Sequence, residues 1–262
     1  MAATMTHSQE QTLDAPLLRS DFQRDGFVVI RNFLPAAEFQ LLTDNVNRFI
    51  RDVVPTLTDR DAFYDDRTKP ETLKQLARME QDPFFAEYRQ HPLWTSTAAS
   101  LLGEPVQVHG VEWFNKPPAT NHATPPHQDN FYFCLQPPQV LTMWLALDPI
   151  DEENGCLRYV PGSHQRGIRP HSRTQTLGFS QGISDYTSED IAHEVAIIAL
   201  PNDVLIHLGN TIHRANANRS QMRHRRSFAM VFQGASATRD QVAFERYLAA
   251  AKAQHHELGL KT

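Results

Sequence analysis

The chain has 262 residues, of which 40% are apolar and 21% are charged, enough for a globular protein with a substantial core. Its formal net charge is −5, and the short run RHRR at 223–226 is the one basic block that stands out. This balance gives no electrostatic reason to expect a nucleic acid or an anionic membrane as a partner, so we expect a protein that acts on small molecules.

The first part of the chain is expected to be mainly helical. Residues 1–15 are polar and are predicted to form a flexible tail, and residues 16–105 a mostly helical flank. A short strand, FVVI at 27–30, follows the turn signal at Gly26. Apolar residues recur at helical spacing in three further segments, namely 36–54, 71–79 and 91–103.

The rest of the chain consists of short β-rich runs separated by Pro, Gly and Asn turns. Seven or eight such runs, NFYFCLQ at 130–136 among them, predict an antiparallel barrel or sandwich over 106–235. Residues 168–190 have weak periodicity and many Ser, Gly and Gln residues, so we expect a long loop over the barrel mouth. A closing helix is predicted at 240–257, and the whole of 1–262 is expected to form one domain.

The cysteine count and the N-terminus indicate the compartment. Cys134 and Cys156 are the only cysteines, and two cysteines do not make a disulfide framework, so a reducing cytoplasm is expected. The N-terminus lacks the basic start and apolar core of a signal peptide, and no run of 18 apolar residues predicts a membrane helix. We therefore expect a cytoplasmic protein without a membrane partner, and the sequence leaves its oligomeric state open.

One short motif carries the first functional hypothesis. In TPPHQDNFYF, His127 and Asp129 lie two residues apart, and alternate residues of an extended strand point to the same side. Such a pair can be hydrogen-bonded partners, or it can hold a metal together with a third ligand. We favour His213 as that ligand, because the other candidate, His207, lies inside an apolar strand. Two histidines and one carboxylate leave three metal positions open and are typical of non-haem Fe(II) oxygenases.

Three stretches together resemble a known family. The motif HQD, the run VLTMWLALDPIDEENGCLRYVPGSHQRG at 140–167 and the run HRANANRSQMRHRRSF at 213–228 look like successive signatures of the phytanoyl-CoA dioxygenase family of Fe(II)/2-oxoglutarate oxygenases. The resemblance implies a mainly β fold with flanking α-helices, a double-stranded β-helix of the jelly-roll, cupin-like type. It also implies that Fe(II) is bound by His127, Asp129 and His213, with 2-oxoglutarate and O₂ as co-substrates.

In the family, an arginine on the strand after the distal histidine binds 2-oxoglutarate, because a buried carboxylate needs a bidentate, permanently charged partner. That arginine usually follows the histidine by eleven residues, and here the position is His224. A one-residue insertion before the strand makes Arg225 the expected anchor, with Arg226 next. Successive strand residues face opposite sides, so both cannot point inward. Arg225 would share its side with the small residues Ser227 and Ala229, which suits a cramped site.

The remaining site assignments concern 2-oxoglutarate and the substrate. Thr142 matches a family position whose hydroxyl contacts 2-oxoglutarate. Four residues near the motifs are expected to contact the substrate, namely Lys116, Asn130, Phe131 and Trp144. The alternatives are a surface lysine at a turn and aromatic residues that belong to the core. We expect a small, partly apolar metabolite, and acyl-CoA stays open although no clear basic track for its phosphates is visible.

The expected activity is hydroxylation of an unactivated C–H bond with release of succinate and CO₂. Asp129 favours this outcome over halogenation, since related halogenases carry a small residue at that position. The alternatives are another outcome of the same iron chemistry (desaturation, ring closure, epimerisation, or C–N or C–P cleavage), a cupin-like metal-binding module without turnover, and a zinc hydrolase. Arg225 separates these possibilities, because a binding module has no need of a 2-oxoglutarate anchor.

Overall fold

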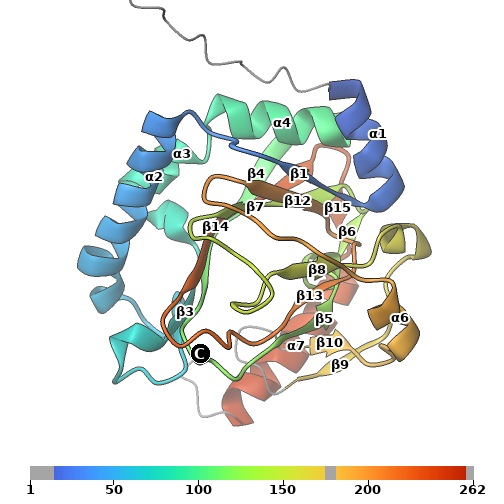
Figure 1. Cartoon of the computed structure of the whole chain (residues 1–262). Coiled ribbons are helices and arrows are strands. Elements are labelled where there is room, and N and C mark those ends of the chain that lie inside the picture. The colour runs from blue at the N-terminus through green and yellow to red at the C-terminus, as the bar shows by residue number, and fades with distance from the viewer. Residues whose placement is uncertain (1–14, 175–180, 258–262) are drawn as a thin grey trace, which may run out of the picture.

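The computed structural model describes residues 15–174 and 181–257, and within them two facing antiparallel sheets form the centre of the molecule (Figure 1). The larger sheet has the strand order β1 (Phe27–Ile30), β12 (Val204–Leu208), β7 (Val140–Ala146), β14 (Arg225–Gly234), β4 (Val106–Lys116), β3 (Leu73–Leu76) and β2 (Ala62–Tyr64). The smaller sheet has the order β11 (Val195–Ala196), β8 (Leu157–Tyr159), β13 (His213–Ala215) and β5 (Thr124–His127). This arrangement is the predicted double-stranded β-helix.

Helices cover the outer face of the larger sheet (Figure 1). They are α1 (Ala15–Asp25), α2 (Ala36–Arg48), α3 (Pro83–Tyr88) and α4 (Pro92–Leu102), and a π-helical turn (Phe49–Val53) and a 3-10 turn (Val54–Thr56) continue α2. The remaining helices are α5 (Asn130–Phe133), α6 (Ser188–Ala192) and α7 (Gln241–Glu257), with 3-10 turns at Pro70–Thr72, Met79–Gln81 and Ser163–Arg166. In the described part of the chain, no helix is long and apolar enough to cross a membrane.

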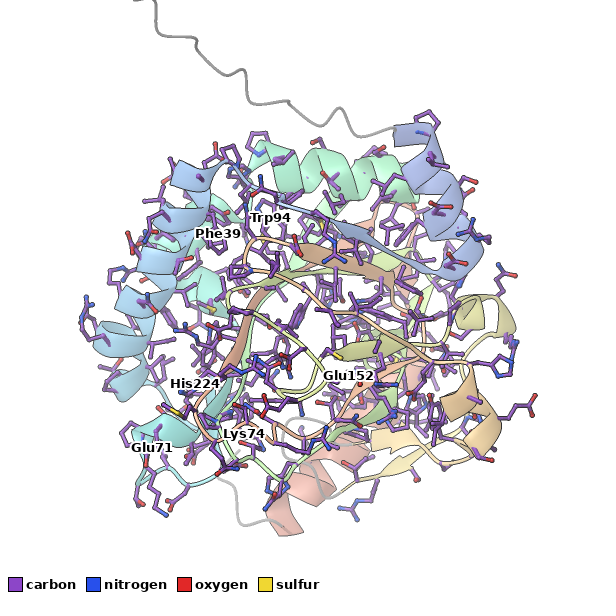
Figure 2. All side chains as sticks on the ribbon, viewed as in Figure 1. Phe39, Glu71, Lys74, Trp94, Glu152 and His224 are labelled. Atoms are coloured by element: carbon purple, nitrogen blue, oxygen red, sulfur yellow. The ribbon has the colours of Figure 1, made fainter. Side chains whose placement is uncertain are left out.

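The alternation of residues along the strands explains why the layers pack in this way. On β14, Phe228 points into the core under the helices, where its ring lies 5.8 Å from that of Trp94. Figure 2 shows Trp94 on the helical side of the sheet. The next residue, Ala229, points the other way and packs between the two sheets with Trp144 and Leu157. Each face of the strand therefore packs into its own core. Burial of one large apolar side chain stabilises the folded state by about 1.5–3 kcal/mol.

The helix predicted at 71–79 is wrong. This segment instead forms β3 between two 3-10 turns and joins the larger sheet, with Gln75 opposite Phe114 of β4. Leu73 and Leu76 are both buried, and their spacing fits one face of a helix as well as it fits this irregular strand. Pairing with a strand far along the chain overrides the local pattern. The predicted helical flank therefore contributes the strands β2 and β3 to the sheet.

The strand predicted at 130–136 is also wrong over most of its length. The chain turns into the short helix α5 and passes through Cys134 in the left-handed region (φ 54°). The amide oxygen of Asn130 accepts a hydrogen bond from the backbone N–H of Leu135 at 3.0 Å, and its Nδ2 donates to the carbonyl of Leu135 at 3.1 Å. This clasp closes the turn, after which β6 (Leu135–Gln136) pairs with β15 (Thr238–Arg239).

The predicted loop at 168–190 has local structure of its own. It contains the hairpin of β9 (His171–Arg173) and β10 (Gln181–Ile183), followed by α6, which starts with a capping box between Thr187 and Asp190. Residues 175–180 of this loop and residues 1–14 of the predicted tail lie outside the described residues. The predicted closing helix is α7.

Candidate metal centre and its pocket

Three side chains converge where the smaller sheet meets α5. His127 ends β5 and His213 begins β13, and the two residues are partners in the antiparallel ladder, so their rings lie 4.1 Å apart between centroids. Asp129 Oδ1 lies 3.4 Å from His127 Nε2 and 3.6 Å from His213 Nε2. The three potential ligand atoms all lie within 4.8 Å of one another, which is a geometry that can hold a metal ion.

Asp129 reaches this position in a different way from the one predicted. It is not on the strand with His127, because β5 ends at His127 and Asp129 has helical angles (φ −57°, ψ −37°) as the residue before α5. The side chains still converge, since the chain turns towards His213 immediately after the strand. The predicted strand alternation is therefore wrong, and a turn after β5 brings Asp129 beside His127 instead.

Both histidines are oriented for metal binding. The Nδ1 atoms of His127 and His213 lie 2.8 Å and 3.0 Å from the carbonyl oxygens of Pro125 and Thr211. A carbonyl can only accept, so each Nδ1 carries the proton and each Nε2 presents its lone pair to the space beside Asp129 that a metal would occupy. Burial, reinforced by the neighbouring His127, also holds the pKa of His213 well below its ordinary value, so His213 is the neutral ligand that a metal requires.

The second oxygen of Asp129 is bound by the larger sheet. Thr142 Oγ1 donates to Asp129 Oδ2 at 2.7 Å, and His207 Nε2 lies 3.1 Å from the same oxygen. An ionised carboxylate can only accept, so His207 Nε2 carries the proton, and His207 Nδ1 accepts from the hydroxyl of Tyr159 at 2.9 Å. Although burial opposes ionisation, the neighbouring His213, His127 and His207 hold the pKa of Asp129 well below its ordinary value. His207 thus orients the carboxylate.

A pocket opens beside these residues towards the start of β14. Phe114, Trp144 and Leu157 form apolar parts of its lining. Arg225, the first residue of β14, also lines it and is 4% exposed, with its guanidinium carbon 5.3 Å from the centre of the Trp144 ring. Within the described residues its Nε has no hydrogen-bond partner. Burial lowers the pKa of Arg225 to about 10, so the guanidinium remains charged at neutral pH.

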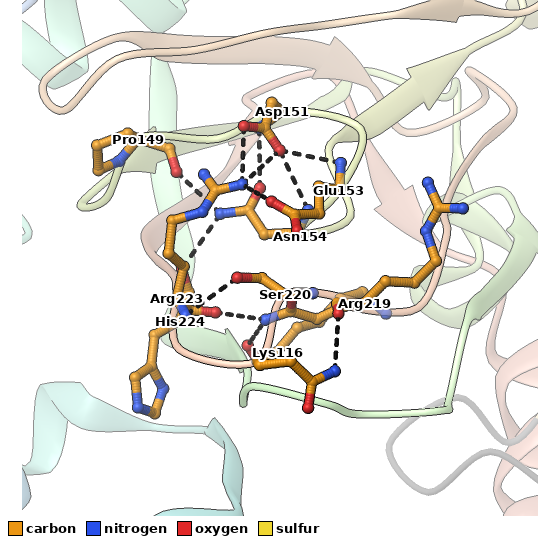
Figure 3. A network of polar contacts seen from close by, with 11 residues as sticks. Lys116, Pro149, Asp151, Glu153, Asn154, Arg219, Ser220, Arg223 and His224 are labelled. Carbon is orange, nitrogen blue, oxygen red and sulfur yellow. Dashed lines mark hydrogen bonds and ion pairs between the residues drawn. The ribbon is translucent and has the colours of Figure 1, made fainter.

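The neighbours of Arg225 in the basic run point elsewhere. Arg226 binds Asp148 with two parallel contacts, from Nε to Oδ2 at 3.0 Å and from Nη2 to Oδ1 at 2.7 Å. Arg223 pairs with Asp151 and Glu153 in the network of Figure 3. Because these arginines have carboxylate partners and Arg225 lacks one in the described chain, the run presents a single inward cation.

Lys116 lies beside Arg225, as its partner in the ladder between β4 and β14. It is buried, and its Nζ donates one hydrogen bond, to the carbonyl of His122 at 2.9 Å. The network of Figure 3 also includes Lys116, whose backbone carbonyl accepts from Asn218 Nδ2 at 2.8 Å. Burial, with the charge of Arg225 second, lowers the pKa of Lys116 well below its ordinary value. Burial thus disfavours the charged form of Lys116, and Arg225 supplies the firm positive charge at this end of the pocket.

The other predicted substrate residues fall into two groups. Trp144 lines the pocket, whereas neither Asn130 nor Phe131 is part of its described lining. The amide of Asn130 is bonded to Leu135 and donates to Asn210 Oδ1 at 3.1 Å. Phe131 stacks on His171 at 4.0 Å between ring centroids. The turn into α5 directs both residues away from the metal centre.

Some pocket residues were not predicted from the sequence. Lys74 and Gln75 of β3 line the pocket, and Figure 2 shows Lys74 on the same side of the molecule as His224. No sequence signal marked them, because their segment has helical spacing. Glu112 of β4 faces the space between the sheets, and it could have been found as the acidic residue that alternates with Phe114 and Lys116 in VQVHGVEWFNK.

Comparison with known proteins agrees with this geometry. Residues 22–227 match the family described as phytanoyl-CoA dioxygenase (PhyH). The chain belongs to the phytanoyl-CoA dioxygenase family. It is 26% identical over 230 residues to the peroxisomal phytanoyl-CoA dioxygenase of Homo sapiens, covering 81% of this chain and 68% of the human protein. It is 24% identical over 245 residues to phytanoyl-CoA dioxygenase 1 of Oryza sativa subsp. japonica, covering 80% of this chain and 86% of the rice protein.

Solved structures share the fold of this family member. The epimerase SnoN from nogalamycin biosynthesis, in complex with Fe3+, alpha ketoglutarate and nogalamycin RO, superposes with a TM-score of 0.69 at 21% identity, covering 89% of this chain and 88% of that one. EvdO2 from Micromonospora carbonacea var. aurantiaca, complexed with 2-oxoglutarate, superposes with a TM-score of 0.66 at 23% identity, covering 92% and 96%.

The protein is therefore a 2-oxoglutarate-dependent non-haem iron dioxygenase. Its cofactor is iron, and 2-oxoglutarate is its co-substrate. The residues present fit both groups, because a triad of two histidines and one carboxylate faces the same pocket as a buried arginine that lacks a protein anion among the described residues.

Proposed function

We propose that His127, Asp129 and His213 bind the iron and that Arg225 binds the distal carboxylate of 2-oxoglutarate. The observation that carries this proposal is the buried guanidinium of Arg225, which lines the pocket of the three potential ligands and has an Nε without a partner in the described chain. A buried cation without an anion is costly, and a bidentate carboxylate is the ligand that offsets this cost. Arg226 ranks behind Arg225 because Asp148 already pairs with it.

Hydrogen bonds within the protein orient the proposed metal ligands. The carbonyls of Pro125 and Thr211 keep the two histidines in the tautomer that binds a metal. Thr142 and His207 occupy one oxygen of Asp129 and leave the other facing the histidines. Iron, when bound, supplies the O₂ activation that is coupled to decarboxylation of 2-oxoglutarate into succinate and CO₂.

Thr142 and Trp144 support this site in specific ways. The hydroxyl hydrogen of Thr142 is donated to Asp129, so we assign Thr142 first to orientation of that carboxylate and second to contact with 2-oxoglutarate through its oxygen. Trp144 places its ring 5.3 Å from the Arg225 guanidinium and limits the directions in which that side chain can move.

We further propose that the enzyme hydroxylates an unactivated C–H bond of a small, partly apolar metabolite. The apolar lining by Phe114, Trp144 and Leu157 supports an apolar part of the substrate. Solved structures of this fold include an epimerase and a carbocyclase from nogalamycin biosynthesis, so epimerisation and ring closure are the competing outcomes. Lys116 lies beside Arg225 at the 2-oxoglutarate end, where its Nζ can donate hydrogen bonds, so we assign it to binding an acceptor group there.

Anaerobic absorption spectroscopy tests the proposed site. Fe(II) and 2-oxoglutarate added to the metal-free protein are expected to give the visible charge-transfer band of the chelate, and His213→Ala is expected to abolish it. His193→Ala, which removes an exposed histidine on the surface, is the matched control and should keep the band. Iron binding without the band, or an undiminished band in His213→Ala, would contradict the proposal. Succinate release on addition of candidate metabolites, followed by identification of the product, then separates hydroxylation from the competing outcomes.

A further inference from the structure

Among the described residues, the interior of the barrel contains a carboxylate, that of Glu112, which the iron site and the 2-oxoglutarate anchor do not use. Glu112 lies in the middle of β4, and its strand neighbours Val111 and Trp113 are buried in the core under the helices. Alternate residues of a strand share a face, so Glu112 points into the space between the sheets together with Phe114 and Lys116, which line the pocket.

The register of the larger sheet places Glu112 close to the metal centre. Glu112 is opposite Ala229 of β14, which is in turn opposite Trp144 of β7. The next inward-facing row on the same strands contains Gly110 of β4 and Thr142 of β7. The hydroxyl of Thr142 donates to Asp129. Two residues along a strand span about 6.8 Å, so Glu112 is one row away from the residue that orients Asp129.

The space beside the Glu112 carboxylate is open. Gly110 has no side chain, and a Cβ placed on it would meet, among the described residues, one atom within 4.0 Å, which is Glu112 Oε1. The carboxylate therefore leans along the strand over Gly110, towards the row that holds Thr142. Glu112 also keeps part of its surface accessible, although it lies deep in the barrel. Glu112 is not part of the described pocket lining, but its hydrogen-bond partner Gln75 and its strand neighbour Phe114 are, so a group that extends past these two residues would reach the carboxylate.

Glu112 lacks the partner that a buried carboxylate normally has. One neutral hydrogen bond reaches it, from Gln75 Nε2 to Oε2 at 3.3 Å, and no Lys, Arg or His of the described residues lies within ion-pair distance. By contrast, the fully buried carboxylate of Glu194 binds both Arg158 and Arg214. Burial, with the charge of Asp129 second, raises the pKa of Glu112 to about 7. Two arginines thus neutralise Glu194, whereas Glu112 has no cationic partner among the described residues and can accept a hydrogen bond from a ligand.

We propose that Glu112 is a substrate-binding residue that accepts hydrogen bonds from a donor group, an ammonium or a hydroxyl, on the primary substrate. This inference rests on the proposed function and specifies its substrate class. The basic residues Arg225 and Lys116 lie at the end of the interior that we assign to the carboxylate of 2-oxoglutarate, and Glu112 lies on the other side of Phe114. An anionic group is repelled beside Glu112, whereas a donor group supplies the missing partner.

A matched set of probes tests the proposal. Cyclohexylamine, cyclohexanol and cyclohexanecarboxylate share one ring and differ in their head group. Each is titrated anaerobically into the enzyme loaded with Fe(II) and 2-oxoglutarate, and the concentration that half-shifts the visible band is measured. At about pH 8, above the Glu112 pKa of about 7, we expect the amine or the alcohol to bind at least about tenfold more tightly than the carboxylate, as hydrogen bonds to a charged group predict.

Variants at Glu112 identify the donor. If the donor is an ammonium, Glu112→Gln loses the preference for the amine about tenfold; if it is a hydroxyl, Glu112→Gln keeps the preference for the alcohol and Glu112→Ala loses it. Glu71→Gln is the control, because Glu71 is exposed at the outer edge of the molecule (Figure 2) and should behave as the wild type.

The two levels of the proposal fail in different ways. Absence of the chelate band in the wild type contradicts the proposed iron and 2-oxoglutarate site. A normal band that no probe shifts, that all three probes shift equally, or that keeps its selectivity in both Glu112 variants overturns the role of Glu112.

Discussion

The two faces of the larger sheet differ in chemistry near the start of β14. On the outer face of β14, Phe228 packs against Trp94 and Phe85 in the core under the helices. On the inner face, Arg225 and Ser227 are buried with polar atoms that lack hydrogen-bond partners in the described part of the chain. Apolar burial on one face stabilises the fold, and that stability allows the other face to keep polar groups available for ligands.

The strongest test of this comparison removes a ring from the outer face. Phe228→Ala is expected to lower the free energy of unfolding by about 3–5 kcal/mol, because it leaves a cavity among fully buried aromatic residues. The measurement is denaturant unfolding of the metal-free protein. Ser227→Ala is the control on the inner face and should leave stability almost unchanged, since it removes a buried hydroxyl that has no partner in the described chain. Equal losses in the two variants would show that the faces do not differ in this way.

The next test compares two adjacent arginines. Arg225→Ala is expected to raise the 2-oxoglutarate concentration needed for half of the chelate band about 100-fold, because two charge-assisted hydrogen bonds are lost. Arg226→Ala should leave that concentration unchanged, since Arg226 faces outward and pairs with Asp148. The reverse result would mean that Arg226 is the anchor.

A smaller effect on metal affinity is expected at Thr142, which contacts the proposed metal ligand Asp129 but not the metal itself. Thr142→Val removes the hydroxyl that donates to Asp129 at 2.7 Å and keeps the shape of the side chain. The loss of such a supporting hydrogen bond typically weakens metal affinity about tenfold or more. Competition with a chelator measures the affinity for Fe(II), and unchanged affinity would show that His207 alone orients the carboxylate.

The parts predicted from the sequence are those encoded in local alternation. The large residues at 228, 230 and 232 and the small residues at 227 and 229 indicated which side of β14 faces inward, and Arg225 is on that side. The family motifs supplied the candidate metal triad, whose side chains the structure brings together. These signals need only neighbouring residues, so the sequence displays them directly.

The parts that were missed depend on distant partners. Leu73 and Leu76 have helical spacing, and only pairing with β4 makes their segment a strand and brings Lys74 and Gln75 to the pocket. Aromatic residues after the H-x-D motif favour a strand by propensity, but the amide clasp of Asn130 turns the chain into α5. For that reason Asn130 and Phe131 lie outside the described pocket lining, although the sequence predicts that they contact the substrate.

The pairing of His127 with His213 has a consequence for the integrity of the smaller sheet. β5 is an edge strand of that sheet, and in the described chain two residue pairs with a register shift between them join it to β13. An ion held by both histidines would cross-link this edge to its neighbour, adding roughly 2.7 kcal/mol at a free concentration of 100 times its Kd. Removal of iron should therefore speed hydrogen exchange first at the amides of Thr124 and His127, so that loading of the metal and ordering of this edge form one equilibrium.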